Sequence, residues 1–276
     1  MLVDTHCHLD FLASDGQDIG DVLKKAKDAG VSKIICVGTS IDASKKCVDI
    51  AQKYSTSEFL IYATCGIHPQ DGKDDIKKYG DNYIDELKKV AQSSNKIVGI
   101  GETGLDYYLT GDKLQLTSDQ EKGFQGELFL EQVELAADLN LPLLIHCRNG
   151  WSEVFDLLSN VNSSGKAGSN VGLFHSWTGD WDAAQKALDL GFYISFSGIL
   201  TFKNAPLVQE VAKKAPIDRI LVETDSPFLS PEPHRGEKNS PENVKITAQF
   251  LADLRGVPID KIAEATTDNA KELFKI

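Results

Sequence analysis

Histidines and carboxylates recur where short apolar segments end, and they are the residues best suited to chemistry. The N-terminal segment Asp4-Thr5-His6-Cys7-His8 places two imidazoles two residues apart. Side chains two apart in a strand point to the same face, so we expect His6 and His8 to face one side together. Two such imidazoles are half of a zinc-type site. Alone, the pair could equally be two satisfied polar residues at a strand end.

Four later apolar segments end in the same way, on Glu102, on His146, on His175 and on the pair Glu223 and Asp225. Glu223 and Asp225 are also two apart and would share a face. A carboxylate can bridge two cations, which an imidazole does not normally do, so Glu102 is a candidate bridge. A helix-capping or surface role is the alternative for Glu102.

Six of these residues make up the predicted metal site: His6, His8, Glu102, His146, His175 and Asp225. A structural zinc closes with four ligands, so four imidazoles and two carboxylates are too many for one such ion. They suit two metal ions that share a carboxylate and keep open positions for water and substrate. Two adjacent ions can generate a hydroxide and stabilise both oxygens of a displacement. Any one residue could be structural, so the hypothesis depends on the set.

Eight short apolar segments carry or precede these residues. They are rich in Val, Ile, Leu and Phe with little strict alternation, which is typical of strands covered on both faces in a parallel sheet. The segments are residues 2–5, 33–37, 60–65, 97–101, 142–146, 171–175, 192–196 and 220–223. We expect the candidate ligands at or just beyond their carboxyl ends.

Helical patterns separate the segments, at residues 18–30, 82–93, 124–139, 182–191, 241–255 and 260–274. Alternating strands and helices predict an α/β fold, a (β/α)8 TIM barrel, as a single domain over residues 1–276 with an extra C-terminal helix. The alternative is an open doubly wound sheet, which would favour a glycine-rich phosphate loop after the first strand; none is present. In a barrel, the carboxyl ends of the strands line the active face.

The composition is that of an ordinary globular protein. Hydrophobic residues are 41% and charged residues 25% of the 276 residues, which argues against disordered, collagen-like and disulfide-scaffold classes. The chain has 41 Asp and Glu and 29 Lys and Arg, which gives a net charge of −12. Because nucleic-acid coat proteins need a positive footprint, this charge argues against an extended basic groove, but not against a small site that holds phosphates locally.

The five cysteines form no CxxC pair and are odd in number, which is typical of reduced thiols inside a cell. No segment has the ~20 apolar residues of a membrane span. We therefore expect a cytoplasmic protein without a membrane partner or an obligate protein partner; a nuclear or organellar location stays open.

These residues also carry a family likeness. The sequence resembles the TatD-like metal-dependent deoxyribonucleases, a branch of the amidohydrolase-type barrels. The matching segments run in order along nearly the whole chain: DTHCHLD (4–10), GIHPQD (66–71), GETGLDYY (101–108), PLLIHCR (142–148), LFHSWTG (173–179), YISFSG (193–198) and ETDSPFLSPEPHRGEKNSPENV (223–244).

The resemblance implies two divalent ions, Mg²⁺, Mn²⁺ or Zn²⁺. One would be held by His6, His8 and Asp225, and the other by His146 and His175. Glu102 would stand between the ions, where many amidohydrolase barrels have a carboxylated lysine. The implied activity is a deoxyribonuclease, often acting 3′ to 5′ and favouring single strands or strand ends of DNA.

The mechanism expected from such a site is hydrolysis of a phosphodiester by a two-metal-activated water. Asp225 is the candidate base and Glu102 the bridging ligand, so both are predicted catalytic residues. Glu223 is predicted to orient a metal ligand from behind.

Three residues are predicted to bind substrate phosphate. His68 follows the third strand, and Arg148 lies two positions after His146; a guanidinium can bind phosphate through two nitrogens. Arg235 lies in the loop after the last strand, where barrels often bind phosphate. The alternatives are a packed loop histidine for His68, a salt bridge to Glu102 or Asp225 for Arg148, and a solvated charge for Arg235.

Four aromatic residues follow strand ends and could stack on bases, or could equally be packing: Tyr107, Trp177, Phe202 and Phe228. Two features depart from the family. Residues 109–122 read as a polar loop longer than usual, and Ser176-Trp177-Thr178-Gly179 replaces a phenylalanine-rich run.

Two other functions fit part of the pattern. A barrel hydrolase for small amides, lactones or phosphate esters would use the same ligands without a polynucleotide. A metal-binding scaffold would bind the ions without turning over an ester.

Overall fold

Eight parallel strands form one sheet whose order follows the chain from β1 to β8. The computed structural model describes residues 1–107, 117–163 and 171–276. The strands are β1 (Leu2–Cys7), β2 (Val31–Val37), β3 (Leu60–Cys65), β4 (Ile97–Asp106), β5 (Leu143–Arg148), β6 (Leu173–Phe174), β7 (Tyr193–Phe196) and β8 (Ile220–Val222). An isolated parallel bridge joins Cys7 to Ser226, so the first and last strands meet. The predicted (β/α)8 barrel is confirmed, and the alternative of an open sheet is wrong.

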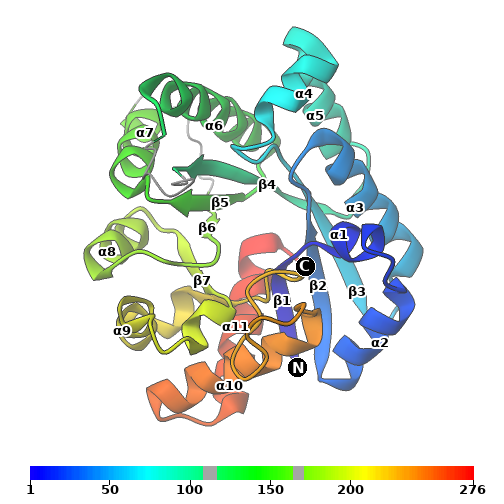
Figure 1. Ribbon diagram of the computed structural model, residues 1–276, viewed down its shortest axis with the longest axis vertical. Helices are drawn as coiled ribbons and strands as arrows, with labels where there is room; N and C mark the ends of the chain where they lie inside the picture. The colour runs from blue at the N-terminus through cyan, green and yellow to red at the C-terminus, as the bar shows by residue number, and fades with distance from the viewer. Residues whose placement is uncertain (108–116, 164–170) are drawn as a thin grey trace.

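Helices surround the strands (Figure 1). They are α1 (Leu9–Ser14), α2 (Ile19–Asp28), α3 (Ile41–Tyr54), α4 (Gly72–Tyr79), α5 (Tyr83–Ala91), α6 (Asp119–Leu139), α7 (Trp151–Ser163), α8 (Trp181–Asp189), α9 (Pro206–Lys214), α10 (Val244–Arg255) and α11 (Ile259–Phe274). Short 3-10 turns lie at η1 (Gly80–Asn82), η2 (Gly198–Thr201), η3 (Ile217–Arg219) and η4 (Pro241–Asn243). None of the helices in the described ranges combines the length and apolarity that a bilayer crossing requires.

The six predicted helices are present, but α1, α3, α4, α7 and α9 were not predicted. In α3 the buried face includes Ser44, Cys47 and Ala51. Ile41 and Val48 lie on the same buried face at helical spacing, so the amphipathic pattern of a helix is present in this segment.

The predicted loop over residues 109–122 is wrong at its C-terminal end. The side chain of Ser118 accepts a hydrogen bond from the Glu121 amide at 3.2 Å, and α6 begins at Asp119. A serine cap followed by acidic residues is a helix start that stabilises unpaired amides. The rest of the predicted loop, residues 109–116, lies outside the described residues.

Two groups of buried residues show which way the strand side chains point. In β5, Leu143, Ile145 and Cys147 pack outward with the helices, whereas Leu144 packs inward. The inner group also contains Val3, Ile35, Val37, Val98, Leu173, Tyr193 and Leu221, with Ala270, Leu273 and Phe274 of α11. His146 and Arg148 follow Leu144 at spacings of two, so they continue the inner face toward the carboxyl edge.

The pairing of β4 is irregular where it reaches the carboxyl edge, between Ile100 and Thr103. Gly101 has φ +151°, and a Cβ there would lie 2.6 Å from Leu144 Cβ. Gly104 has φ +138°, and a Cβ there would overlap the carbonyl oxygen of His146. Glycine is needed at both positions because the strands approach closely in a backbone region that other residues avoid.

Gly104→Ala is therefore expected to lower the free energy of unfolding by about 3 kcal/mol or more, from backbone strain and overlap together. Gly123→Ala is the matched control, because Gly123 lies exposed in α6 with nothing within 4 Å of an added Cβ. This control should gain roughly 0.5–1 kcal/mol from helix propensity. Urea unfolding measures both; equal effects of the two substitutions would contradict the close approach of β4 and β5.

Candidate metal centre

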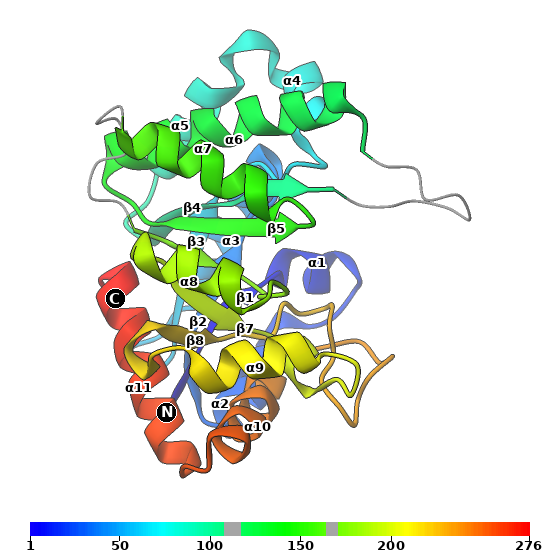
Figure 2. The same ribbon diagram turned by 90° about the vertical axis from the view of Figure 1, so that its left-hand side faces the viewer.

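The six predicted ligand residues meet at the carboxyl edge of the barrel. Figure 2 shows this edge as the side toward which β4 and β5 point, with α1 and the segment after β8 beside it. The residues come from β1 (His6), the start of α1 (His8), β4 (Glu102), β5 (His146) and the segments after β6 (His175) and β8 (Asp225). All but His146 are buried, and only 12% of the His146 side chain is exposed.

Glu102 lies at the centre of the group and divides its two oxygens between two pairs of imidazoles. Its Oε2 is 3.4 Å from His6 Nε2 and 3.7 Å from His8 Nε2. Its Oε1 is 2.9 Å from both His146 Nδ1 and His175 Nε2. One carboxylate thus faces two separate sets of nitrogens, which is the arrangement of a bridging ligand.

Asp225 completes the set around His6 and His8. Its Oδ1 is 3.6 Å from His6 Nε2 and 3.4 Å from His8 Nε2. The backbone fixes this position, because the Asp225 amide donates to the His6 carbonyl at 2.8 Å. Nearby, buried Asp4 accepts from the Thr224 amide at 2.9 Å and from the Thr224 hydroxyl at 2.6 Å. Closure of the barrel between β1 and β8 therefore assembles this half of the cluster.

Hydrogen bonds behind two of the rings aim their other nitrogens inward. His8 Nδ1 lies 2.9 Å from the Val37 carbonyl, so Nδ1 must be the donor. His175 Nδ1 lies 3.3 Å from Glu223 Oε1, which also accepts from the Ser176 amide at 2.8 Å. In the neutral ring a proton on Nδ1 leaves the Nε2 lone pair free, and this is how proteins orient imidazole ligands. The structure thus places Glu223 directly behind His175.

The electrostatics of the cluster favour a cation. Burial opposes ionisation of Glu102, but His175 and His68 outweigh it and hold the pKa of Glu102 well below its usual value. Burial also works against a charged His8, yet Asp225 and Glu102 raise the pKa of His8 to about 9. The carboxylates therefore draw positive charge into the space between the rings. Protons can supply that charge, and so can divalent metal ions, for which imidazole and carboxylate donors are suitable ligands.

Two imidazole nitrogens face one another at 3.3 Å in the first half (His6 Nε2 and His8 Nε2) and at 3.0 Å in the second (His146 Nδ1 and His175 Nε2). Sets of three donors within 4.8 Å of one another include His6 with His8 and Asp225 in the first half, and His68 with Glu102 and His146 in the second. A further set joins His6 with Glu102 and His175. The residues present therefore fit metal binding in both halves.

His68 lies beside the second half of the cluster. Its Nδ1 accepts from the Gln70 amide at 3.2 Å, and its Nε2 is 3.7 Å from Glu102 Oε1. Burial lowers the pKa of His68 to about 4, so the ring is neutral at physiological pH. Because Nδ1 is an acceptor, the neutral ring carries its proton on Nε2. His68 thus presents a donor toward the cluster.

Arg148 lies at the same edge with 47% of its side chain exposed, and its Nε is 3.4 Å from Asp106 Oδ1. The salt bridge considered from the sequence was to Glu102 or Asp225; the structure instead pairs Arg148 with Asp106, among its contacts. Buried Asp106 also approaches His146, with Oδ2 3.8 Å from Nε2.

Asp106 was not among the predicted site residues. Its amide donates to Gln125 Oε1 at 2.9 Å, which fixes the end of β4. The signal that could have found it is spacing, since Asp106 lies four positions after Glu102 in one strand and so shares its face.

Arg235 is not brought into this group. Its guanidinium lies 4.1 Å from the centre of the Phe202 ring and 4.0 Å from Glu232. Among the other aromatic residues considered, Tyr107 and Trp177 are buried packing residues, whereas 49% of Phe228 is exposed.

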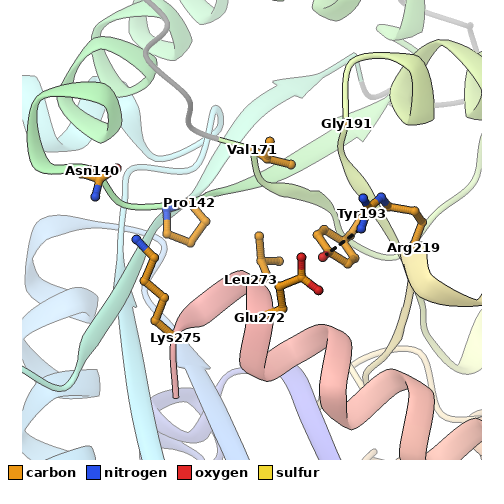
Figure 3. A pocket seen from close by; sticks show the side chains of 9 residues that line it. All are labelled: Asn140, Pro142, Val171, Gly191, Tyr193, Arg219, Glu272, Leu273 and Lys275. Carbon is orange, nitrogen blue, oxygen red and sulfur yellow. Dashed lines mark hydrogen bonds between the residues drawn. The ribbon is translucent and has the colours of Figure 1, made fainter.

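The five cysteines are free and buried, as the reduced state predicts. A cavity of about 220 Å³ lies at the opposite, amino-terminal end of the strands, lined by Pro142, Tyr193, Arg219 and Glu272 among others (Figure 3). Because barrel chemistry takes place at the carboxyl edge, this cavity is not the catalytic site.

A comparison with known families matches residues 3–275 to the family described as TatD related DNase. This chain belongs to that family. The TatD likeness extends to the uncharacterized metal-dependent hydrolases YcfH of Escherichia coli, 37% identical over 100% of this chain and 96% of that protein, and YabD of Bacillus subtilis, 37% identical over 100% of both. Among solved structures, the TatD homologue YjjV of Escherichia coli has a TM-score of 0.85 at 30% identity, covering 100% of this chain and 98% of that one.

Asp106→Asn is expected to lower the affinity of this TatD chain for divalent metal by about 10- to 100-fold, because the carboxylate beside His146 is lost. Glu223→Gln should act in the same direction through His175. Asp182→Asn, an exposed acid in the first turn of α8, should leave affinity unchanged. Competition with a chromogenic chelator measures all three; an Asp106→Asn protein with the affinity of Asp182→Asn would contradict the role of Asp106.

Proposed function

We propose that this chain is a metal-dependent hydrolase of the TatD family that cleaves phosphodiester bonds in DNA, preferring single strands or strand ends. The observation that carries the proposal is Glu102, whose two oxygens face two separate sets of imidazoles. Two sets of imidazoles that share a carboxylate could hold two metal ions. Two such ions would stabilise the attacking and the leaving oxygen of a phosphoryl transfer. Attack from the 3′ end is carried over from the family resemblance.

Two divalent ions would be held by these residues, one by His6, His8 and Asp225 and the other by His146 and His175, with Glu102 shared. When bound, such ions supply positive charge that lowers the pKa of water and offsets the charge of the phosphate. Which ion is used is part of the test below.

Asp225 is proposed to accept the proton of the attacking water. Burial opposes its ionisation, but His8 and His6 outweigh it and lower the pKa of Asp225 below its usual value. The carboxylate is therefore ionised at neutral pH and available as an acceptor. Its side chain is 11% exposed, so it borders solvent while remaining next to the imidazoles.

The phosphate is proposed to be held by His68 and Arg148. The Nε2–H of His68 points toward the cluster, and this neutral donor does not depend on protonation near pH 7. The pairing of Arg148 with Asp106 keeps its guanidinium near His146. Arg235 is a weaker candidate, because its guanidinium lies over Phe202.

The first test is removal and return of metal. Chelated protein is expected to lose cleavage of end-labelled single-stranded DNA and to regain it with Mg²⁺, Mn²⁺ or Zn²⁺. The rate at low substrate should fall steeply with salt, because phosphate contacts release counterions. Cleavage of a neutral amide or lactone instead, with little salt dependence, would replace the nuclease by the small-substrate hydrolase. Metal binding without turnover of any ester would favour a scaffold.

Asp225→Asn is expected to lower kcat on the same DNA by about 100-fold or more, as for loss of a general base. Asp182→Asn is again the control, because it makes the same Asp-to-Asn change at an exposed position away from the cluster. Single-turnover kinetics at saturating metal separates loss of the base from loss of metal affinity. Wild-type single-turnover rates for Asp225→Asn would show that another group accepts the proton.

Arg148→Ala should reduce kcat/KM for DNA by about 10- to 100-fold, the range of a charge-assisted hydrogen bond. Arg235→Ala removes the same chemical group, yet a smaller change is expected because that guanidinium lies over Phe202. Steady-state kinetics on one oligonucleotide compares the two; a larger effect at Arg235 would reverse this assignment of the phosphate site.

A further inference from the structure

Phe228 is a large apolar side chain that stays exposed beside the cluster. It follows the proposed ligand Asp225 by three residues, and 49% of it is accessible to solvent. Isolated exposed apolar residues are common on protein surfaces, so exposure alone decides nothing. What distinguishes Phe228 is that its ring lies next to His8 of the cluster and packs against Phe11.

The backbone around Phe228 is firmly held. Its amide donates to the Asp225 carbonyl at 2.9 Å, and its carbonyl accepts from the Asn239 side chain at 2.7 Å. Asn239 is fully buried and also donates to the Thr224 carbonyl at 2.9 Å. The exposed ring is therefore presented from a fixed backbone tied to the metal ligand, which limits the entropy lost when something binds to it.

Two rings support Phe228 from the side of the cluster. The ring centre of Phe11 lies 6.0 Å away at 81°, and that of His8 lies 6.0 Å away at 67°. His8 and Phe11 are themselves stacked, at 5.0 Å and 22°. Within the described ranges, no aromatic ring lies parallel on Phe228, so a planar group can stack there.

The other three aromatic residues considered do not offer such a surface. Trp177 is 1% exposed and Tyr107 is 6% exposed. Phe202 carries the Arg235 guanidinium at 4.1 Å. Of the four, Phe228 combines exposure with a direct neighbour in the cluster.

We propose that Phe228, supported by Phe11, forms a subsite for the nucleobase of the nucleotide next to the scissile phosphate. The inference rests on the proposed phosphodiester function. A nucleotide whose phosphate meets the cluster can place its base on this ring, because Phe228 and His8 are neighbours. Stacking accepts every base, so the subsite selects nucleotides over other phosphate esters without selecting a sequence.

The test compares two oligonucleotides that differ only in whether the nucleotide at the cleavage site carries its base or is abasic. Phe228→Ala is expected to lower kcat/KM about tenfold on the base-bearing strand, within the range measured for loss of one stacked aromatic, and to leave the abasic strand unchanged. Phe228→Tyr should retain wild-type selectivity. Leu207→Ala, which removes another strongly exposed apolar side chain (54% exposed), should change neither substrate.

Equal losses on the two strands would show that Phe228 only supports the loop, and would overturn the subsite. Unchanged kinetics on both strands would overturn it as well. If the wild-type protein, with metal supplied, cleaves neither oligonucleotide, the proposed function itself fails and the subsite fails with it. Thermal unfolding of each variant identifies any loss that comes from misfolding.

Discussion

A single buried carboxylate, that of Glu102, organises the catalytic end of this barrel. Charge buried in a protein is strongly unfavourable unless it is paired. Glu102 meets this requirement with two pairs of imidazoles, one pair on each oxygen. The four rings therefore have to converge on one point from three separate segments of the chain. The closely packed glycines of β4 allow the carboxylate to reach that point, because larger residues there would collide with β5.

A second layer of polar groups fixes how the rings face Glu102. The Val37 carbonyl and Glu223 accept from the outer nitrogens of His8 and His175, and Asp106 approaches the outer nitrogen of His146. Each acceptor belongs to, or directly follows, a strand of the barrel, so the orientation of each imidazole depends on the register of the sheet. The family membership and this geometry agree on a hydrolytic metal site, while the DNA substrate remains the proposal that the kinetics decide.

Much of this arrangement follows from the sequence, for reasons that can be named. Regular alternation in β5 places His146 and Arg148 on one face, and eight apolar runs predict the barrel. The predicted fourth strand stopped at residue 101, whereas β4 continues to Asp106, so Asp106 was overlooked although it shares a strand with Glu102. Residue spacing also does not predict the partners of the two arginines. Arg148 pairs with Asp106, and the Arg235 guanidinium lies over the Phe202 ring. The start of α6 was missed because its cap at Ser118 precedes a polar turn, whereas α3 has an amphipathic pattern that could have been predicted.

The meeting of β1 with β8 has a consequence for synthesis of the protein. Glu102, His146 and His175 are made early, but Glu223, which lies behind His175, is made only after β8. Asp225 is made some 50 residues after His175, near the end of the chain, and reaches His6 only when the last strand pairs with the first. A ribosome-bound chain that ends before β8 therefore lacks both Asp225 and Glu223, so neither half of the cluster is complete. The complete centre exists only after the barrel has closed, so an incomplete chain would lack the proposed hydrolytic site until its fold is finished.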